Sequence, residues 1–171
     1  MKNSIVLKLG KFFMRTSGLK IYIVDDEDAY FTPEMISIAA EAGFTNIQRF
    51  SRIRKDTLKE FISSPPEIII LDIKGIADPD VAKDGFGVAA IMYEQTKAFV
   101  VITSAHKYHL HEYHDKYDYV IHQRLLTAVD FVSELQSITN QYLARKIRFY
   151  EKLVFRIGFS IIKKAVMPSA D

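Results

Sequence analysis

The sequence contains no cysteine among its 171 residues, which rules out disulfide bonds and metal sites built from thiolates. Thiol redox chemistry is therefore excluded, and a reducing compartment is compatible with the composition. No stretch reaches the about 18 uninterrupted apolar residues that a membrane-spanning helix needs. The first residues have lysines within a short apolar run and no convincing cleavage site before Gly18, so they make a poor signal peptide. We expect one cytoplasmic domain with a real core.

Acidic residues are missing from one end of the chain and scarce at the other. Residues 1–18 carry four basic residues and no acid, and residues 144–171 carry seven basic residues and two acids. Because the whole chain has a formal charge of +2, the middle must carry −7. We therefore divide the chain into a basic N-terminal extension (1–18), an acidic domain (19–143) and a basic amphipathic C-terminal helix (144–171).

Buried strands and amphipathic helices alternate along residues 19–143. Apolar runs predict strands within residues 19–24, 67–74 and 98–105, and shorter strands are predicted within residues 46–51 and 118–122. Apolar residues at helical spacing predict helices within residues 33–44, 55–64, 84–96 and 127–146, with a further short helix in the histidine-rich segment 106–117. Such alternation indicates an α/β fold in which helices cover both faces of a parallel sheet.

Acidic residues follow two of the predicted strands directly. Asp25 and Asp26 end the first strand, and Asp72 ends the third. If these strands are neighbours, the three carboxylates meet at one edge of the sheet, where close negative charges are costly unless a cation lies among them. Oxygen ligands suit Mg²⁺. The alternative is that these acids cap the following helix or lie in a solvated loop.

Four strand-end signatures together resemble the response-regulator receiver domain of two-component signalling. They are VDD at 24–26, IIILD at 68–72, ITSA at 102–105 and DYVIH at 118–122. The resemblance covers about residues 19–143. It implies a flavodoxin-like (βα)5 receiver fold, a five-stranded parallel sheet in the order 2-1-3-4-5, here with extra helical segments at both ends.

The resemblance also implies a role for each matching residue. Asp72 matches the aspartate that accepts a phosphoryl group from a phosphohistidine. Asp25 and Asp26 match the pair that, with Asp72, holds Mg²⁺, and Lys74 matches the position whose backbone carbonyl binds the metal. Metal-assisted transfer suits a carboxylate nucleophile, because the incoming group is itself anionic.

The switch residues match only in part. Ser104 matches the hydroxyl that bonds the phosphoryl oxygens, and Tyr119 matches the aromatic residue whose rotamer follows it. His122 and Gln123 stand where receivers have lysine and proline. A neutral imidazole must be protonated to replace the lysine charge. Two interpretations stay open, a tuned or pH-sensitive switch and a decayed one.

Two further segments depart from the receiver pattern. The connection from Asp72 to Gly85 is longer than usual, and it has Ile76 in place of the usual proline. Asp78 and Asp80 within it are either extra metal ligands or, as we favour, turn residues. The segment 106–114 contains four histidines without a spacing that specifies a metal site, and we expect an exposed face there (His106, His109, His111 and His114).

The C-terminal helix has an apolar stripe opposite a basic one. The stripe consists of Ile147, Tyr150, Val154, Ile157 and Ile161. Three alternatives stay open for this stripe. It packs against the chain itself or a second copy, it binds a protein partner, or residues 145–164 lie on an anionic membrane face. No module for specific nucleic-acid binding is evident.

These observations predict a stand-alone, atypical receiver that accepts phosphate on Asp72 with Mg²⁺ as cofactor. Its partners would be a histidine kinase or phosphotransfer protein and a downstream protein target. We expect no enzyme beyond Mg²⁺-dependent self-phosphorylation and autodephosphorylation. The alternative is a phosphorylation-independent pseudo-receiver that acts as a dimerisation or binding scaffold. A metal-dependent phosphatase is disfavoured, because the chain offers no substrate cap and no second aspartate two residues after Asp72. The expected location is the cytoplasm, with a peripheral contact at the inner membrane face as one option.

Overall fold

The computed structural model describes residues 18–27, 30–104, 115–122 and 127–166, without the side chains at positions 104, 122 and 153–166. The first 17 residues of the predicted N-terminal extension and most of the predicted short helix in segment 106–117 lie outside the described residues, as do the four histidines of that segment.

Five parallel strands form the single sheet of the described residues. They are β1 (Ile21–Val24), β2 (Ile47–Phe50), β3 (Ile68–Asp72), β4 (Phe99–Ser104) and β5 (Tyr119–His122). The strand order is β2-β1-β3-β4-β5, and every neighbouring pair is parallel. The predicted fold class and strand order are confirmed. The central strand β3 pairs with both β1 and β4, so the ends of these three strands lie side by side.

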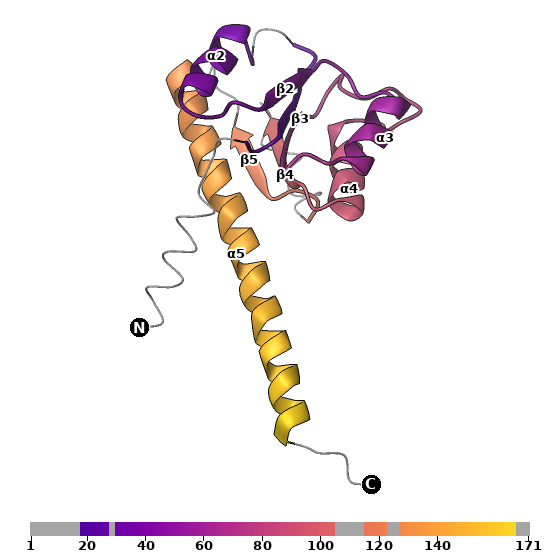
Figure 1. Cartoon of the computed structure of the whole chain (residues 1–171). Coiled ribbons are helices and arrows are strands. Elements are labelled where there is room, and N and C mark those ends of the chain that lie inside the picture. The colour runs from indigo at the N-terminus through magenta and orange to yellow at the C-terminus, as the bar shows by residue number, and fades with distance from the viewer. Residues whose placement is uncertain (1–17, 28–29, 105–114, 123–126, 167–171) are drawn as a thin grey trace.

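In the described part of the chain, four helices cover the two faces of the sheet (Figure 1). They are α2 (Pro33–Glu41), α3 (Lys55–Ser63), α4 (Gly85–Gln95) and α5 (Ala128–Val166). One core cluster joins α2 and α5 to the side chains of Ile21, Ile23, Ile68 and Ile70. The other joins α3 and α4 to the alternate side chains of the same strands, such as Tyr22 and Ile69. Both faces are buried, which explains why these strands are continuously apolar.

Local signals fix the helix ends next to the sheet edge. The Thr32 hydroxyl accepts a hydrogen bond from the Met35 amide, and Pro33 opens α2. The Asp84 carboxylate caps α4 by accepting from the Gly87 amide at 3.0 Å. Both caps lie in loops that follow the carboxyl ends of strands. The same edge of the sheet carries the predicted site.

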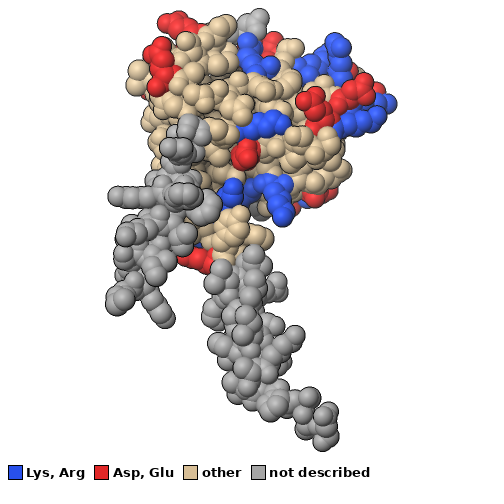
Figure 2. Space-filling view, in the orientation of Figure 1, with Lys and Arg blue, Asp and Glu red and all other residues tan. Residues whose placement is uncertain are grey.

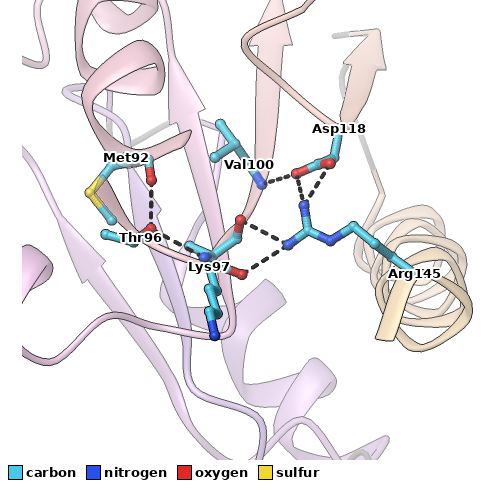
Figure 3. Close-up of polar contacts among 7 residues, drawn as sticks. Met92, Thr96, Lys97, Val100, Asp118 and Arg145 are labelled. Carbon is cyan, nitrogen blue, oxygen red and sulfur yellow. Dashed lines mark hydrogen bonds and ion pairs between the residues drawn. The ribbon is translucent and has the colours of Figure 1, made fainter. Parts of the chain in front are cut away.

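Arg145 fastens α5 to the opposite, amino edge of the sheet (Figure 3). Its Nη1 donates to both carboxylate oxygens of Asp118, at 2.7 and 2.6 Å, and its Nη2 donates to the carbonyls of Lys97 and Ala98. Asp118 also accepts from the Val100 amide at 2.9 Å. The guanidinium therefore joins the helix to the start of β4 and to the residue before β5.

Helix α5 continues well beyond the sheet (Figure 1). Its 39 residues correspond to a length of roughly 58 Å at about 1.5 Å per residue. Phe131, Leu135 and Ile138 bury the first part against the sheet, and Tyr142 is the last buried residue up to position 152, where the described side chains of the helix end. Within the described residues, no helix combines the length and apolar character needed to cross a membrane.

Candidate functional site

Asp25 is buried at the carboxyl edge of the sheet, directly after β1. Its side chain is 1% exposed. One carboxylate oxygen, Oδ1, accepts a hydrogen bond from the Glu27 amide at 2.8 Å. The other, Oδ2, is buried and has no hydrogen-bond partner among the residues that the structure describes. A buried carboxylate oxygen without a partner costs free energy. Binding of a cation to this oxygen would remove that cost.

Asp72 is the last residue of β3 and is partly buried at the same edge. The Lys74 amide donates to its Oδ2 at 3.2 Å. The Thr103 hydroxyl lies 3.5 Å from its Oδ1, because Thr103 faces Asp72 in the register of β3 and β4. The carboxylate is thus oriented by a backbone donor from its own loop and by a weak contact from the neighbouring strand.

Asp26 is exposed and lies over the loop that follows β3. A Cβ atom built on Gly75 would fall 1.8 Å from Asp26 Oδ2, so the carboxylate occupies the space next to that glycine. Gly75 has a φ of 72°, a conformation in which most side chains are disfavoured. The absence of a side chain at position 75 lets the second acid of the pair approach the backbone beyond Lys74.

The three carboxylates act on one another electrostatically. The pKa of Asp25 is raised from 3.8 to about 6, chiefly by burial and in smaller part by the charges of Asp72 and Asp26, while the Glu27 amide and Arg49 oppose the rise. Burial also raises the pKa of Asp72, with Asp26 adding to the rise and the Thr103 hydroxyl opposing it. Such mutual destabilisation of negative charge is typical of a cation site.

The donor set fits Mg²⁺, although the carboxylates do not enclose it. Among the residues that the structure describes, no group of three or more His, Cys, Asp and Glu side chains is placed to hold a metal ion. Mg²⁺ is commonly bound through one or two carboxylates and several waters, so a complete cage of side chains is not required. Two observations support binding of Mg²⁺ here. Asp25 Oδ2 lacks a partner among the described residues, and all the donor atoms are oxygens.

The remaining predicted site residues lie on two neighbouring strand ends. Ser104 ends β4 and His122 ends β5, and the two residues are paired in register. Their side chains lie outside the described structure. Tyr119 lies at the start of β5, where its hydroxyl donates to Glu134 of α5 at 3.0 Å. The backbone thus places Ser104 one residue beyond the Thr103 that contacts Asp72.

The long loop after β3 is held by ion pairs with the region around α3. Lys55 Nζ lies 2.9 Å from Asp80 Oδ2, and Arg52 Nε lies 3.6 Å from Asp78 Oδ1. The hydrogen bond from Lys55 lowers the pKa of Asp80. Ile76, which replaces the usual proline, is fully buried. Both carboxylates thus have basic partners within the protein, and our interpretation of Asp78 and Asp80 as turn residues stays a prediction.

Two contacts at the site involve residues that the sequence analysis did not single out. Thr103 was part of the ITSA signature, but its contact with Asp72 depends on strand register, which local sequence does not give. Arg49 of β2 donates through Nη2 to the carbonyls of Asp25, at 3.4 Å, and Glu27, at 2.9 Å. The sequence feature that could have pointed to Arg49 is the position of an arginine inside a short strand, where its charge acts on the buried Asp25.

Comparisons with known proteins support the receiver fold. No protein-family model matches the sequence, and no curated protein matches it either. The signal receiver domain of a putative LuxO repressor protein from Vibrio parahaemolyticus aligns with 78% of this chain and 95% of its own, at a TM-score of 0.57 and 18% identity.

Two further solved structures give the same result. The response regulator domain of Thermotoga maritima CheB aligns with 74% of this chain and 96% of its own, at a TM-score of 0.52 and 14% identity. NtrX from Brucella abortus, in complex with ATP, aligns with 75% of this chain and 29% of its own, at a TM-score of 0.55 and 18% identity. The chain therefore has the fold of response-regulator receiver domains, as the sequence signatures predicted.

Proposed function

We propose that this protein is an atypical stand-alone receiver that accepts a phosphoryl group on Asp72 from a histidine kinase or phosphotransfer protein. One observation carries the proposal. Asp25 Oδ2 is buried without a partner beside two further carboxylates, at the carboxyl edge of a sheet with the receiver fold. In open α/β sheets this edge is where ligands bind.

Mg²⁺ would be bound through one or two of the carboxylates of Asp25, Asp26 and Asp72, with the Lys74 carbonyl and waters as further ligands. When bound it would supply positive charge that offsets the anionic nucleophile and phosphoryl group. Asp72 attacks phosphorus with one carboxylate oxygen. A new P–O bond forms as the P–N bond of the phosphohistidine breaks, and the histidine nitrogen leaves with the electron pair and takes up a proton. The Lys74 amide orients the carboxylate for this attack.

The signal would then pass to a downstream protein through Ser104 and Tyr119. Tyr119 donates to Glu134 of α5, so a change in the tyrosine rotamer breaks a contact with that helix. His122 takes the role of the usual lysine when protonated, which a neighbouring phosphoryl dianion favours. The sequence also left open that the C-terminal helix forms a homodimer or contacts the inner membrane face. Both options concern the exposed part of α5.

The test is phosphorylation of the full chain by acetyl phosphate, followed by intact mass. We expect one phosphoryl adduct in the presence of Mg²⁺, and none with a chelator or in Asp72→Asn. Asp78→Asn serves as a matched control, because that carboxylate pairs with Arg52 instead, and it should be modified like the parent protein. A parent protein without the adduct, or an adduct that persists in Asp72→Asn, would refute the proposal.

A second candidate is a pseudo-receiver that binds partners without a phosphate cycle. The histidine and glutamine at positions 122 and 123 favour it, because they remove the lysine that receivers use to pair with the phosphoryl group. Restoring the lysine separates the two candidates. If His122→Lys gains the adduct that the parent protein lacks, the chain is a scaffold that has lost a switch.

A further inference from the structure

The part of α5 beyond the sheet exposes large apolar side chains. Ile147, Phe149 and Tyr150 are 40%, 56% and 47% exposed, respectively. The rings of Phe149 and Tyr150 lie 5.9 Å apart, centroid to centroid, in an edge-to-face arrangement. They stand on a helix whose preceding turns, through Tyr142, belong to the core. The same helix therefore passes from a buried apolar face to an exposed one.

This exposed part of the helix is strongly basic. Residues 145–166 contain seven Lys and Arg residues and one acid, Glu151, for a net charge of +6. Lys97 Nζ lies 5.8 Å from the centre of the Phe149 ring, which adds a cation next to the exposed aromatic. Figure 2 shows further basic side chains on the part of the globule from which α5 emerges. Cationic and aromatic groups are thus interleaved at this end of the molecule.

A pocket of about 490 Å³ lies where α5 leaves the sheet. Pro65 and Pro66, which precede β3, line it together with Phe149 and Tyr150 of α5. Lys146 also lines it, and its ammonium hydrogen-bonds the Tyr142 hydroxyl at 3.2 Å. The apolar surface of the helix is therefore continuous with a hollow on the globule.

The sequence continues the same character to the end of the helix. Residues 153–162 read LVFRIGFSII, with Arg156 as their one charged residue. A seam at alternating spacings of three and four runs through positions 147, 150, 154, 157 and 161. Phe149, Phe155 and Phe159 fall outside that seam by their helical spacing.

A second copy of the chain does not account for these features. A paired helix would bury the seam but leave the three phenylalanines at its outside. It would also place two helical segments of charge +6 side by side, which repel each other. Across a parallel seam, the one opposite-charge pair that these residues can form is Lys146 of one helix with Glu151 of the other. The charge and the wide apolar arc both point to an anionic apolar partner.

We infer that residues 145–166 of α5 bind the surface of an anionic phospholipid bilayer. The aromatic and aliphatic side chains enter the boundary between headgroups and acyl chains, and the Lys and Arg side chains contact the lipid phosphates. The helix lies on the bilayer without crossing it. The receiver domain is held at the membrane by this contact whether or not Asp72 accepts phosphate.

The test is flotation of the full chain with vesicles of equimolar phosphatidylcholine and phosphatidylglycerol, compared with phosphatidylcholine alone. We expect the protein to float with the anionic vesicles only and to dissociate as salt is raised. Replacing two exposed cations in Arg148→Gln/Lys152→Gln should weaken partitioning roughly thirty-fold, at about 1 kcal/mol for each cation.

A pair of serine variants separates insertion from simple charge attraction. Phe149→Ser should weaken partitioning at least about ten-fold, because a buried phenylalanine is lost from the interface. Val129→Ser removes an apolar side chain that is even more exposed, 75% against 56% for Phe149, from the first turn of α5, far from the basic segment, and should leave flotation unchanged. Circular dichroism verifies that both variants keep their helix.

Three results would overturn the inference. The first is a protein that stays unbound with both vesicle types. The second is a lipid-free dimer in sedimentation equilibrium that Phe149→Ser leaves intact and that does not float. The third is flotation unaffected by Phe149→Ser and by the double glutamine variant, since the contact would then lie elsewhere on the chain.

Discussion

At the amino edge of the sheet, the Asp118 carboxylate is bound by Arg145 and by the Val100 amide, and the arginine in turn binds two backbone carbonyls. At the carboxyl edge, Asp25 has one oxygen with a single amide donor and another with no partner. Both edges bury a carboxylate, but the protein supplies the full set of partners at one edge alone. The carboxylate whose partners come from the protein serves the fold, whereas the carboxylate that lacks a partner is the one at which we propose that a cation binds.

The strongest test of the amino edge is Arg145→Ala. The variant leaves the mostly buried Asp118 carboxylate without its bidentate partner and frees the carbonyls of Lys97 and Ala98. We expect a loss of about 3 kcal/mol in the free energy of unfolding, measured by urea denaturation. Arg148→Ala is the matched control, because Arg148 is exposed and contacts the Ala144 carbonyl of its own helix, and it should change stability by less than about 0.5 kcal/mol. Equal losses in both variants would contradict the assignment.

A side chain at position 75 should disturb the carboxyl edge. In Gly75→Ala the new Cβ displaces the Asp26 carboxylate, at a cost of about 2 kcal/mol. The rise in melting temperature caused by Mg²⁺ should shrink as well. Gly18→Ala also replaces a glycine of positive φ, but no atom lies within 4 Å of its new Cβ. It should keep the full Mg²⁺ response even where it lowers stability.

The buried carboxylate predicts a pH dependence of a defined sign. Because folding raises the pKa of Asp25 from 3.8 to about 6, the folded state binds its proton more tightly than the unfolded state. Stability is therefore lost as pH rises from about 4 to about 6 and stays lower above that range.

Asp25→Asn removes this penalty and should stabilise the protein by about 1–2 kcal/mol at neutral pH, less than the full shift implies because the new amide is itself a buried polar group. Thermal melts across the pH range measure it. Asp56→Asn, at a side chain that is 98% exposed, should leave the pH profile unchanged. An unchanged profile in Asp25→Asn would show that Asp25 is not its source.

The smallest expected effect concerns Thr103. Thr103→Val removes the hydroxyl that lies 3.5 Å from Asp72 and that lowers its pKa, so the pKa of Asp72 should rise further while stability changes by less than about 1 kcal/mol. NMR titration of the carboxyl carbon measures the shift. Thr139→Val is the matched control, because its buried hydroxyl has no hydrogen-bond partner within the described part of the chain and it lies on α5, away from the site. If both variants give the same Asp72 titration, the contact has no influence.

The two edges also differ in how much of their structure could be predicted from the sequence. The acids at the carboxyl edge could be predicted because each follows an apolar strand directly, and the strand order that joins Asp25 to Asp72 came with the receiver signatures. The pairing of Arg145 with Asp118 spans 27 residues and depends on the packing of α5 against the sheet. Local sequence carries no signal of it. For the same reason Thr103 was missed, since strand register alone brings it to Asp72.

Titration of the parent protein with Mg²⁺, followed by amide NMR, tests the proposed cation site most directly. We predict that one ion binds and shifts the amide signals of residues 25–27 and 72–75, with proton release near pH 6 from the Asp25 carboxyl. Asp26→Asn should weaken this binding, and signals around Asp118 should not move. An absence of Mg²⁺-dependent shifts at residues 25–27 and 72–75 would contradict the account, as would equal shifts at the Asp118 edge.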